Sequence, residues 1–297
     1  MATDQDREIL KQMAAAARPM GSVAELRSML EMFMPMMNSN LPEVGAFHEN
    51  VEIRPALRAD VATPKGAGPF PVVVYLHGGG WVAGSPKSHQ KLGMQFAEEG
   101  YLCINVDYRL APEHPFPAAL DDCVFAIKWA AENAKRWNGD ANRLAVGGDS
   151  AGGNLTAASL TSLAAESNAG PKPRAALLIY GVYDMAATLA RGGNDASLEM
   201  MLKAYAAGGY PALLEDPRLS PLKAIRPGTL PPSFVICGTA DALLPESKHI
   251  AEAMGRADIR HELHLIDEMP HGFVQMAMLS GCGEGLKLMF DFLRRTV

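Results

Sequence analysis

Two segments with different apolar patterns flank a short motif, Gly148-Asp-Ser-Ala-Gly152. Residues 143–147 form an apolar run typical of a buried strand, and residues 154–160 have the small-residue composition of a packed helix. A serine inside a Gly-x-Ser-x-Gly motif occupies a sharp strand-to-helix turn, where flanking side chains would collide with neighbouring backbone. The motif therefore predicts that Ser150 stands above a sheet edge, at the positive end of a helix dipole. The alternative is a glycine-rich turn with an ordinary N-cap serine.

The chain beyond about residue 70 alternates between strand-like and helix-like segments. Such an alternation builds an α/β fold with a mostly parallel central sheet and helices on both faces. Strands are expected at residues 72–76, 101–107, 143–146, 175–179, 234–237 and 262–266, after two antiparallel strands between residues 45 and 63.

Residues 1–44 precede the sheet and are expected to form an N-terminal helical cap segment. A capping box at Ser22–Glu25 predicts the start of its second helix, and Pro35 is expected to end that helix. Its apolar positions include Phe33 and Met34 among several methionines. Unbranched thioethers suit either a plain core or a surface that accommodates varied apolar ligands, and both interpretations stay open.

A second segment breaks the alternation at about residues 185–210. The connection between the strands near residues 180 and 233 is longer than an α/β loop needs, and it contains a helical pattern at residues 197–206. We interpret it as a cap insertion over the carboxyl ends of the strands. The catalytic domain would then run from residue 45 to residue 297.

Composition excludes several classes of partner. The net charge is −6 with no Lys/Arg run, so nothing favours nucleic acid or an anionic membrane surface. No apolar run is long enough for stable membrane insertion, and the acidic N-terminus differs from a secretory signal, so a cytoplasmic location is expected. The four cysteines lack metal-ligand spacing and are expected to be buried free thiols, not disulfides or a metal site.

A nucleophilic serine needs a base within hydrogen-bond reach and an acid that orients the base. When a Gly-x-Ser-x-Gly serine lies on this kind of turn, the chain order is serine, acid, histidine. His271 follows the last expected strand in a Met-Pro-His-Gly-Phe loop, at the sheet edge where ligands bind. The other histidines after Ser150 lie within a helix or on the last strand. His271 is therefore the predicted base.

Two aspartates compete for the role of the orienting acid. Asp241 follows the strand just before the histidine's strand, whereas Asp184 follows the preceding one and could instead cap the start of the insertion. We favour Asp241 for this reason. Asp149 is adjacent to Ser150, so its side chain cannot support the imidazole, and we assign it a structural role.

The oxyanion of a tetrahedral intermediate needs backbone N–H donors. The run His77-Gly-Gly-Gly-Trp81 directly follows the strand at residues 72–76, and its glycines allow the backbone to bend its amides inward. The amide of Ala151 is a further candidate donor. A glycine-rich phosphate loop is the alternative, but the Lys-Ser/Thr of a P-loop is missing.

Several motifs in order resemble the hormone-sensitive-lipase-like family of bacterial carboxylesterases over roughly residues 45–295. They are His77-Gly-Gly-Gly-Trp81, Asp107-Tyr-Arg-Leu-Ala-Pro-Glu-His114, Gly148-Asp-Ser-Ala-Gly-Gly153, Asp216-Pro217 with Ser220-Pro-Leu222, and the contexts of Asp241 and His271. The resemblance implies an α/β-hydrolase fold and ester hydrolysis without a cofactor. It implies Ser150 as nucleophile, His271 as base, Asp241 as acid, and the amides of Gly78, Gly79 and Ala151 as the oxyanion hole. The short, Gly/Ala-rich insertion departs from the family, so the acyl preference does not transfer.

The function expected from these residues is that of a serine carboxylesterase acting on short-chain acyl esters through an acyl-enzyme. Trp81, Phe33 and Met34 are the expected substrate-pocket residues. An amidase or acyltransferase with the same triad is the nearest alternative. A non-catalytic small-molecule binding protein, like the plant gibberellin receptors that resemble this family without its histidine, is another. The last strand, residues 260–266, is expected at a sheet edge and could pair two copies into a homodimer.

Overall fold

A computed structural model describes residues 2–16, 20–166, 170–192 and 195–297. Within these ranges the strands form one eight-stranded sheet of order β1-β2-β4-β3-β5-β6-β7-β8. β2 pairs antiparallel with β1 and with β4, and all later neighbours are parallel, as the alternation predicts. The strands are β1 (Ala46–Arg54), β2 (Leu57–Thr63), β3 (Phe70–Leu76), β4 (Leu102–Asp107), β5 (Gly139–Asp149), β6 (Ala175–Ile179), β7 (Ser233–Gly238) and β8 (His261–Ile266).

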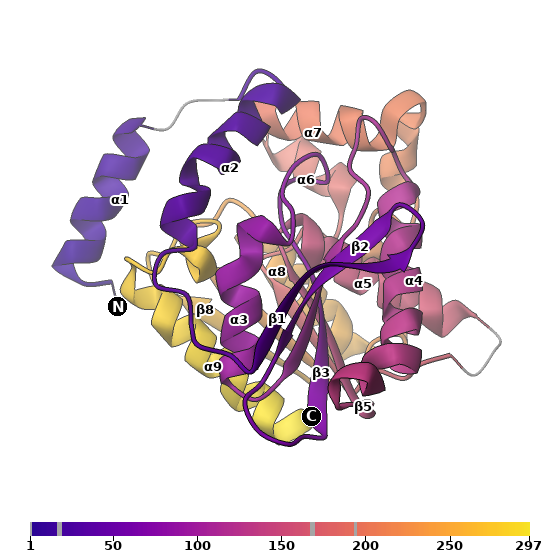
Figure 1. Ribbon diagram of the computed structural model, residues 1–297. Coiled ribbons are helices and arrows are strands. Elements are labelled where there is room, and N and C mark those ends of the chain that lie inside the picture. The colour runs from indigo at the N-terminus through magenta and orange to yellow at the C-terminus, as the bar shows by residue number, and fades with distance from the viewer. Residues whose placement is uncertain (1, 17–19, 167–169, 193–194) are drawn as a thin grey trace.

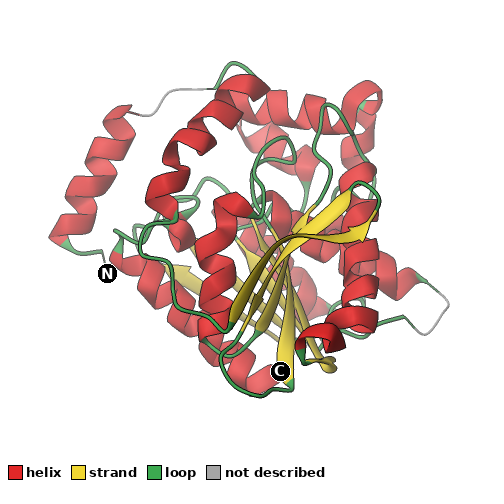
Figure 2. Ribbon diagram, viewed as in Figure 1, coloured by secondary structure: helices red, strands yellow, loops and turns green. Residues whose placement is uncertain are grey.

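Helices cover both faces of this sheet (Figure 2). Those described are α1 (Asp4–Ala16), α2 (Val23–Met37), α3 (Gln90–Glu98), α4 (Ala118–Asn133), α5 (Ala151–Ala165), α6 (Met185–Gly192), α7 (Ala196–Ala206), α8 (Leu244–Arg256) and α9 (Ser280–Thr296). α4, α5 and α8 contribute to one hydrophobic core, and α3 and α9 to the other. Every residue of β6 and β7 is buried between these two layers, which explains why both strands read as continuous apolar runs.

The predicted insertion forms α6 and α7, which lie at the top of the molecule in Figure 1. The helix expected at residues 197–206 is confirmed as α7. Residues 193 and 194, inside the predicted insertion, lie outside the described residues. The N–H of Met20, just before α2, donates to Ser197 Oγ at 2.8 Å, so the N-terminal segment and the insertion adjoin one another.

The end predicted for α2 is wrong, because the helix continues through Pro35 to Met37. Proline removes one backbone donor, but the last turn is held by the N–H of Asn38, which donates to Met34 O at 3.0 Å. The Asn38 side chain also accepts the N–H of Lys91 at 3.1 Å. Tertiary contacts of this kind are invisible in a local pattern. The predicted start is confirmed, since Ser22 Oγ accepts the N–H of the glutamate three residues later.

β8 lies at one edge of the sheet, as expected. In the chain as described, no helix combines the length and the apolar character that crossing a membrane requires.

Candidate active site

Ser150 occupies a strained turn between β5 and α5. Its backbone angles are φ 54° and ψ −117°, and its N–H donates to Ile179 O at 2.9 Å. Positive φ is costly for a residue with a Cβ and is characteristic of functional turns. A Cβ on Gly152 would lie only 1.8 Å from Leu76 O, so only glycine allows the start of α5 to press against the end of β3. The turn therefore brings Ser150 beside the loop that follows β3.

The structure brings Ser150, His271 and Asp241 together in a hydrogen-bonded chain. The Ser150 hydroxyl lies 2.8 Å from His271 Nε2, and His271 Nδ1 lies 2.8 Å from Asp241 Oδ2. Asp241 also accepts the N–H of Leu243 at 2.8 Å, which fixes the carboxylate. Both distances are within hydrogen-bond range for a nucleophile, a base and an orienting acid.

The three side chains differ in exposure, and this difference sets their electrostatics. The Asp241 side chain is fully buried, whereas 42% of the His271 side chain is exposed. Desolvation lowers the pKa of His271, but the hydrogen bond and the negative charge of Asp241 outweigh it and raise the pKa above its usual value. The imidazole is thus prepared to accept the serine proton.

The competing acid lies elsewhere. Asp184 Oδ1 accepts the N–H of Ala187 at 3.0 Å and so caps the first turn of α6. The sequence did not reveal a third acid, Glu246, which is fully buried and accepts the N–H groups of Tyr183 and Asp184 at 2.7 and 2.6 Å. It ties the start of the insertion to α8. A glutamate in the first turn of a helix gives no signal of such a distant contact.

The loop after β3 corrects one expectation about the oxyanion hole. The N–H of Gly78 donates to Asp149 Oδ1 at 3.0 Å, so this amide is already used inside the protein. Gly79 has φ +127°, and a Cβ there would lie 2.1 Å from Ala83 O. Within the described ranges, the N–H groups of Gly79, Gly80 and Ala151 donate to no protein acceptor. Gly80 is a residue that sequence reasoning missed.

Asp149 is the centre of a buried polar cluster beneath this loop. It is 3% exposed and interacts with the Tyr75 hydroxyl at 2.9 Å, the Gly78 amide, His89 Nε2 at 3.0 Å and Gln275 Nε2 at 3.1 Å. Burial raises the pKa of Asp149, but the interactions with His89 and Tyr75 outweigh burial and lower it. The cluster joins the loop after β3 to the segment after the triad histidine. The structural role of Asp149 is therefore to join these two segments.

The three expected pocket residues differ in exposure. Trp81 is 2% exposed and stacks on Tyr205 of α7, with ring centroids 5.0 Å apart and planes 6° apart. It is therefore enclosed under the insertion and does not line an open pocket. Phe33 is 44% exposed, and Met34 is half-buried on α2. Trp81 thus departs from the expected pocket role. No sequence signal indicated this, because its stacking partner Tyr205 lies in a distant segment.

Met201 of α7 lies directly against Gly80. A Cβ on Gly80 would be only 2.1 Å from Met201 Sδ. The thioether therefore occupies the space beside a free amide of the loop. Its place in a helical pattern gave no signal of this contact.

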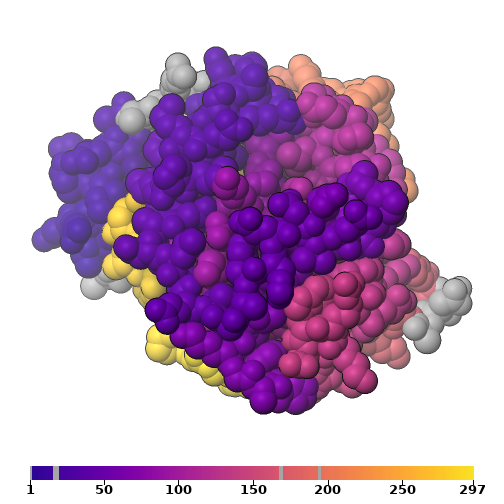
Figure 3. All heavy atoms as spheres, viewed as in Figure 1, coloured from indigo at the N-terminus to yellow at the C-terminus, as the bar shows by residue number. Residues whose placement is uncertain are grey.

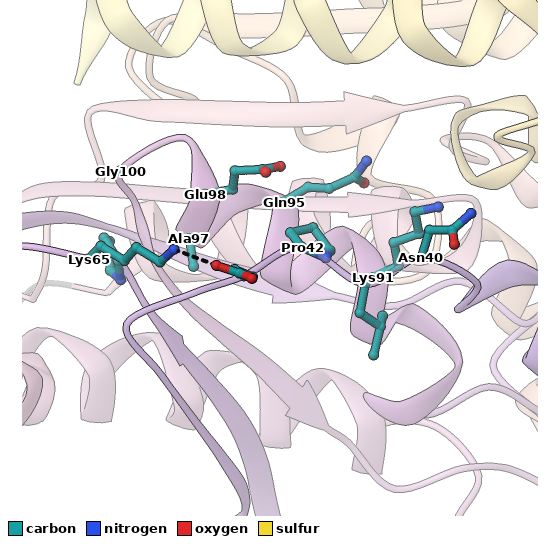
Figure 4. Close-up of a pocket in the computed structure, with 11 residues that line it drawn as sticks. Asn40, Pro42, Lys65, Lys91, Gln95, Ala97, Glu98 and Gly100 are labelled. Carbon is teal, nitrogen blue, oxygen red and sulfur yellow. Dashed lines mark hydrogen bonds and ion pairs between the residues drawn. The ribbon is translucent and has the colours of Figure 1, made fainter.

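A groove of about 670 Å³ lies away from Ser150, between α3 and the segment that leads into β1 (Figure 4). Lys65 and Glu43 form an ion pair across part of it, at 2.9 Å. Its lining residues are Asn40, Leu41, Pro42, Glu43, Pro64, Lys65, Lys91, Gln95, Ala97, Glu98 and Gly100. None of them forms a hydrogen bond with Ser150, Asp241 or His271.

Known proteins resemble this chain in sequence and in fold. Residues 73–275 match the family model described as alpha/beta hydrolase fold. The chain is 34% identical over 229 residues to the carboxylic ester hydrolase LipN of Mycobacterium tuberculosis, a match that covers 73% of this chain and 61% of LipN. A structure of an esterase from the bacterial hormone-sensitive lipase family has a TM-score of 0.83 at 29% identity, covering 100% of this chain and 99% of that one. The chain belongs to the hormone-sensitive-lipase-like esterases of the α/β-hydrolase fold.

The name of a second relative of this esterase specifies an ester substrate. The ethyl acetate hydrolase of Pseudomonas putida is 34% identical over 233 residues, which cover 75% of this chain and 72% of that protein. The esterase therefore spans only about three fifths of LipN but almost three quarters of the ethyl acetate hydrolase.

Proposed function

We propose that the esterase hydrolyses short-chain acyl esters through an acyl-enzyme on Ser150. His271 removes the hydroxyl proton as Ser150 Oγ attacks the ester carbonyl, and Asp241 holds the imidazole and stabilises its charge. His271 then protonates the leaving alcohol. Water, activated by the same imidazole, releases the acid and restores the serine. The hydrogen-bonded chain of 2.8 Å contacts through His271 carries this proposal.

The proposed oxyanion hole consists of the amides of Gly79, Gly80 and Ala151. We exclude the Gly78 amide because it already donates to Asp149. A buried N–H that has a carboxylate partner is a poor donor to substrate, whereas an amide without a protein acceptor requires one. The amide of Ala151 begins α5, where the helix dipole also favours an oxyanion.

Two observations support a preference for short acyl groups. Met201 occupies the space beside Gly80 and leaves less room there for a long chain. The relative from Pseudomonas putida is named for an ester with a two-carbon acyl group. The carboxylesterase names of the relatives favour oxygen esters over amides.

The experiment is a series of p-nitrophenyl esters from acetate to dodecanoate, with kcat/KM measured for each. We expect a maximum at short chains and a steep fall beyond it, together with a burst of nitrophenolate at high enzyme concentration if deacylation limits turnover. A flat profile or a maximum at long chains would contradict the short-chain proposal. Added alcohols and amines test the alternatives, since an acyltransferase would divert the acyl-enzyme to them and an amidase would cleave matched anilides.

Two further expectations stay predictions. A cytoplasmic location is supported by four buried cysteines without disulfides, which suits a reducing compartment. Pairing of two copies through β8 is supported by Leu265, 39% exposed on this edge strand.

A further inference from the structure

Arg27 of α2 reaches across to two buried carbonyl groups of the main chain. Its Nε donates to Val82 O at 2.8 Å and its Nη2 donates to Ala111 O at 3.1 Å. Val82 and Ala111 are 0% and 1% exposed. The guanidinium also forms a bidentate pair with Glu113, at 2.8 and 2.7 Å. One side chain on the exposed N-terminal segment therefore satisfies acceptors in two distant segments.

Both carbonyls belong to the structure around the proposed oxyanion hole. The N–H groups of Val82 and Ala83 donate to Gly79 O at 3.2 and 2.9 Å, which closes the turn at residues 79–83. The N–H of Ala111 donates to Trp81 O at 2.9 Å, inside the same turn. Arg27 thus contacts the turn directly at Val82. It also contacts the turn indirectly, through Ala111, whose N–H binds Trp81 O.

The contacts of Arg27 with Glu113 and the two carbonyls do not depend on pH in the range where His271 acts as a base. The hydrogen bond from Arg27 lowers the pKa of Glu113 to about 2, so the carboxylate stays ionised wherever His271 is active as a base. Arginine presents its donors in a rigid planar fork, and it binds both carbonyls and the carboxylate at once. A lysine ammonium, as a single point of charge, cannot make all of these contacts together.

We propose that Arg27 is a positioning residue for the oxyanion hole. The cap helix α2, through this guanidinium, holds the turn at residues 79–83 in the conformation that presents the amides of Gly79 and Gly80. The inference rests on the proposed oxyanion hole. It adds that a residue of the N-terminal segment, outside the sheet, determines how well that hole binds developing negative charge.

The test replaces Arg27 with alanine and compares kcat, KM and the inhibition constant of an alkyl trifluoromethyl ketone, whose hemiketal places an oxyanion in the hole. We expect kcat to fall about tenfold, less than the 10²–10³-fold cost of deleting a donor outright, with KM changed less than twofold. The trifluoromethyl ketone should lose affinity by a similar factor. Arg295→Ala is the matched control, because Arg295 pairs with Glu262 at 2.9 Å far from the site, and it should change none of the three values.

Two variants separate the carbonyl contacts from the ion pair. Glu113→Gln removes the carboxylate charge but leaves the contacts of Arg27 with Val82 and Ala111, so kcat should stay close to that of the unmodified chain. The kcat of Arg27→Lys should lie between those of the unmodified chain and Arg27→Ala. If the alanine variant does not fold, the lysine variant serves as the test. Millimolar guanidinium chloride, compared with equal sodium chloride, should restore part of the kcat of Arg27→Ala only.

Three results would overturn the proposal. They are an unchanged kcat in Arg27→Ala and Arg27→Lys, a lower kcat with unchanged ketone affinity, and a Glu113→Gln variant as impaired as Arg27→Ala. Failure of the underlying site is recognisable separately. If the unmodified esterase itself did not bind the ketone covalently through Ser150, the proposed oxyanion hole would fail whatever Arg27 does.

Discussion

The carboxyl edge of the sheet and helix α2 adjoin one another, yet different forces hold them in place. β7, which leads to Asp241, is completely buried, and so are the last six residues of β5, which leads to Ser150. α2 contains no fully buried residue: Val23, Leu26 and Leu30 pack against the core while only half-buried, and polar contacts of Arg27 and Asn38 add to this attachment. In Figure 3 the indigo atoms of the N-terminal helices lie at the upper left of the face shown.

This difference predicts where substitutions act. Burial of apolar surface contributes about 25 cal/mol per Å², whereas an exposed ion pair contributes about 0–1 kcal/mol. The buried strands at the sheet edge are therefore costly to disturb, while each half-buried or polar contact of α2 contributes less to stability. Changes at the sheet edge should remove the chemistry, and changes in the cap should adjust its efficiency or its choice of substrate.

The largest expected effect tests whether Ser150 and His271 act as one unit. Ser150→Ala and His271→Ala should each lower kcat by roughly 10⁵–10⁶-fold, because the hydroxyl is a poor nucleophile without the base. The double variant should be little worse than either single one. Steady-state rates on p-nitrophenyl acetate with active-site titration would measure this. Multiplicative losses in the double variant would show that the two residues act independently and would break the assignment.

The next largest effect discriminates between the two aspartates. Asp241→Asn should lower kcat by roughly 10⁴-fold, because the amide no longer holds the correct tautomer of the imidazole. Asp184→Asn is the matched control. An asparagine caps a helix about as well as an aspartate, so activity and Tm should change little. If Asp184→Asn proved the more damaging of the two, the acid would have to be reassigned.

The triad was predictable because each member stands at a position defined by its neighbours along the chain. Ser150 lies between a strand and a helix, and Asp241 and His271 each follow a strand, so parallel pairing alone brings them to one edge. The mostly parallel pairing of the sheet follows from the same alternation. These signals are local in sequence and can be recognised without knowledge of any tertiary contact.

The rest depended on contacts between distant segments. Three glycines in a row do not show which amide faces outward, since that depends on the backbone angles and on the competing carboxylate of Asp149. Trp81 looked like a pocket residue until its stacking on Tyr205 was known. The capture of main-chain carbonyls by Arg27 has no sequence signature at all. Position in the chain predicted which side chains come together at the sheet edge, but not the groups that hold them there.

The smallest expected effects lie inside the cap and compare two of its apolar side chains. Met201 fills the space beside Gly80, whereas Phe33 is 44% exposed on α2. Met201→Ala should therefore admit longer acyl chains, with gains in relative kcat/KM of up to about fourfold for each additional CH₂ that becomes buried, at roughly 0.8 kcal/mol per CH₂. Phe33→Ala should leave the chain-length profile within about twofold, because a side chain already in water has little apolar burial to offer. The p-nitrophenyl ester series measures both, and Tm measured on the same samples separates a change of pocket from a loss of fold. A chain-length profile that changed in Phe33→Ala and not in Met201→Ala would mean that α2, and not α7, forms the acyl pocket.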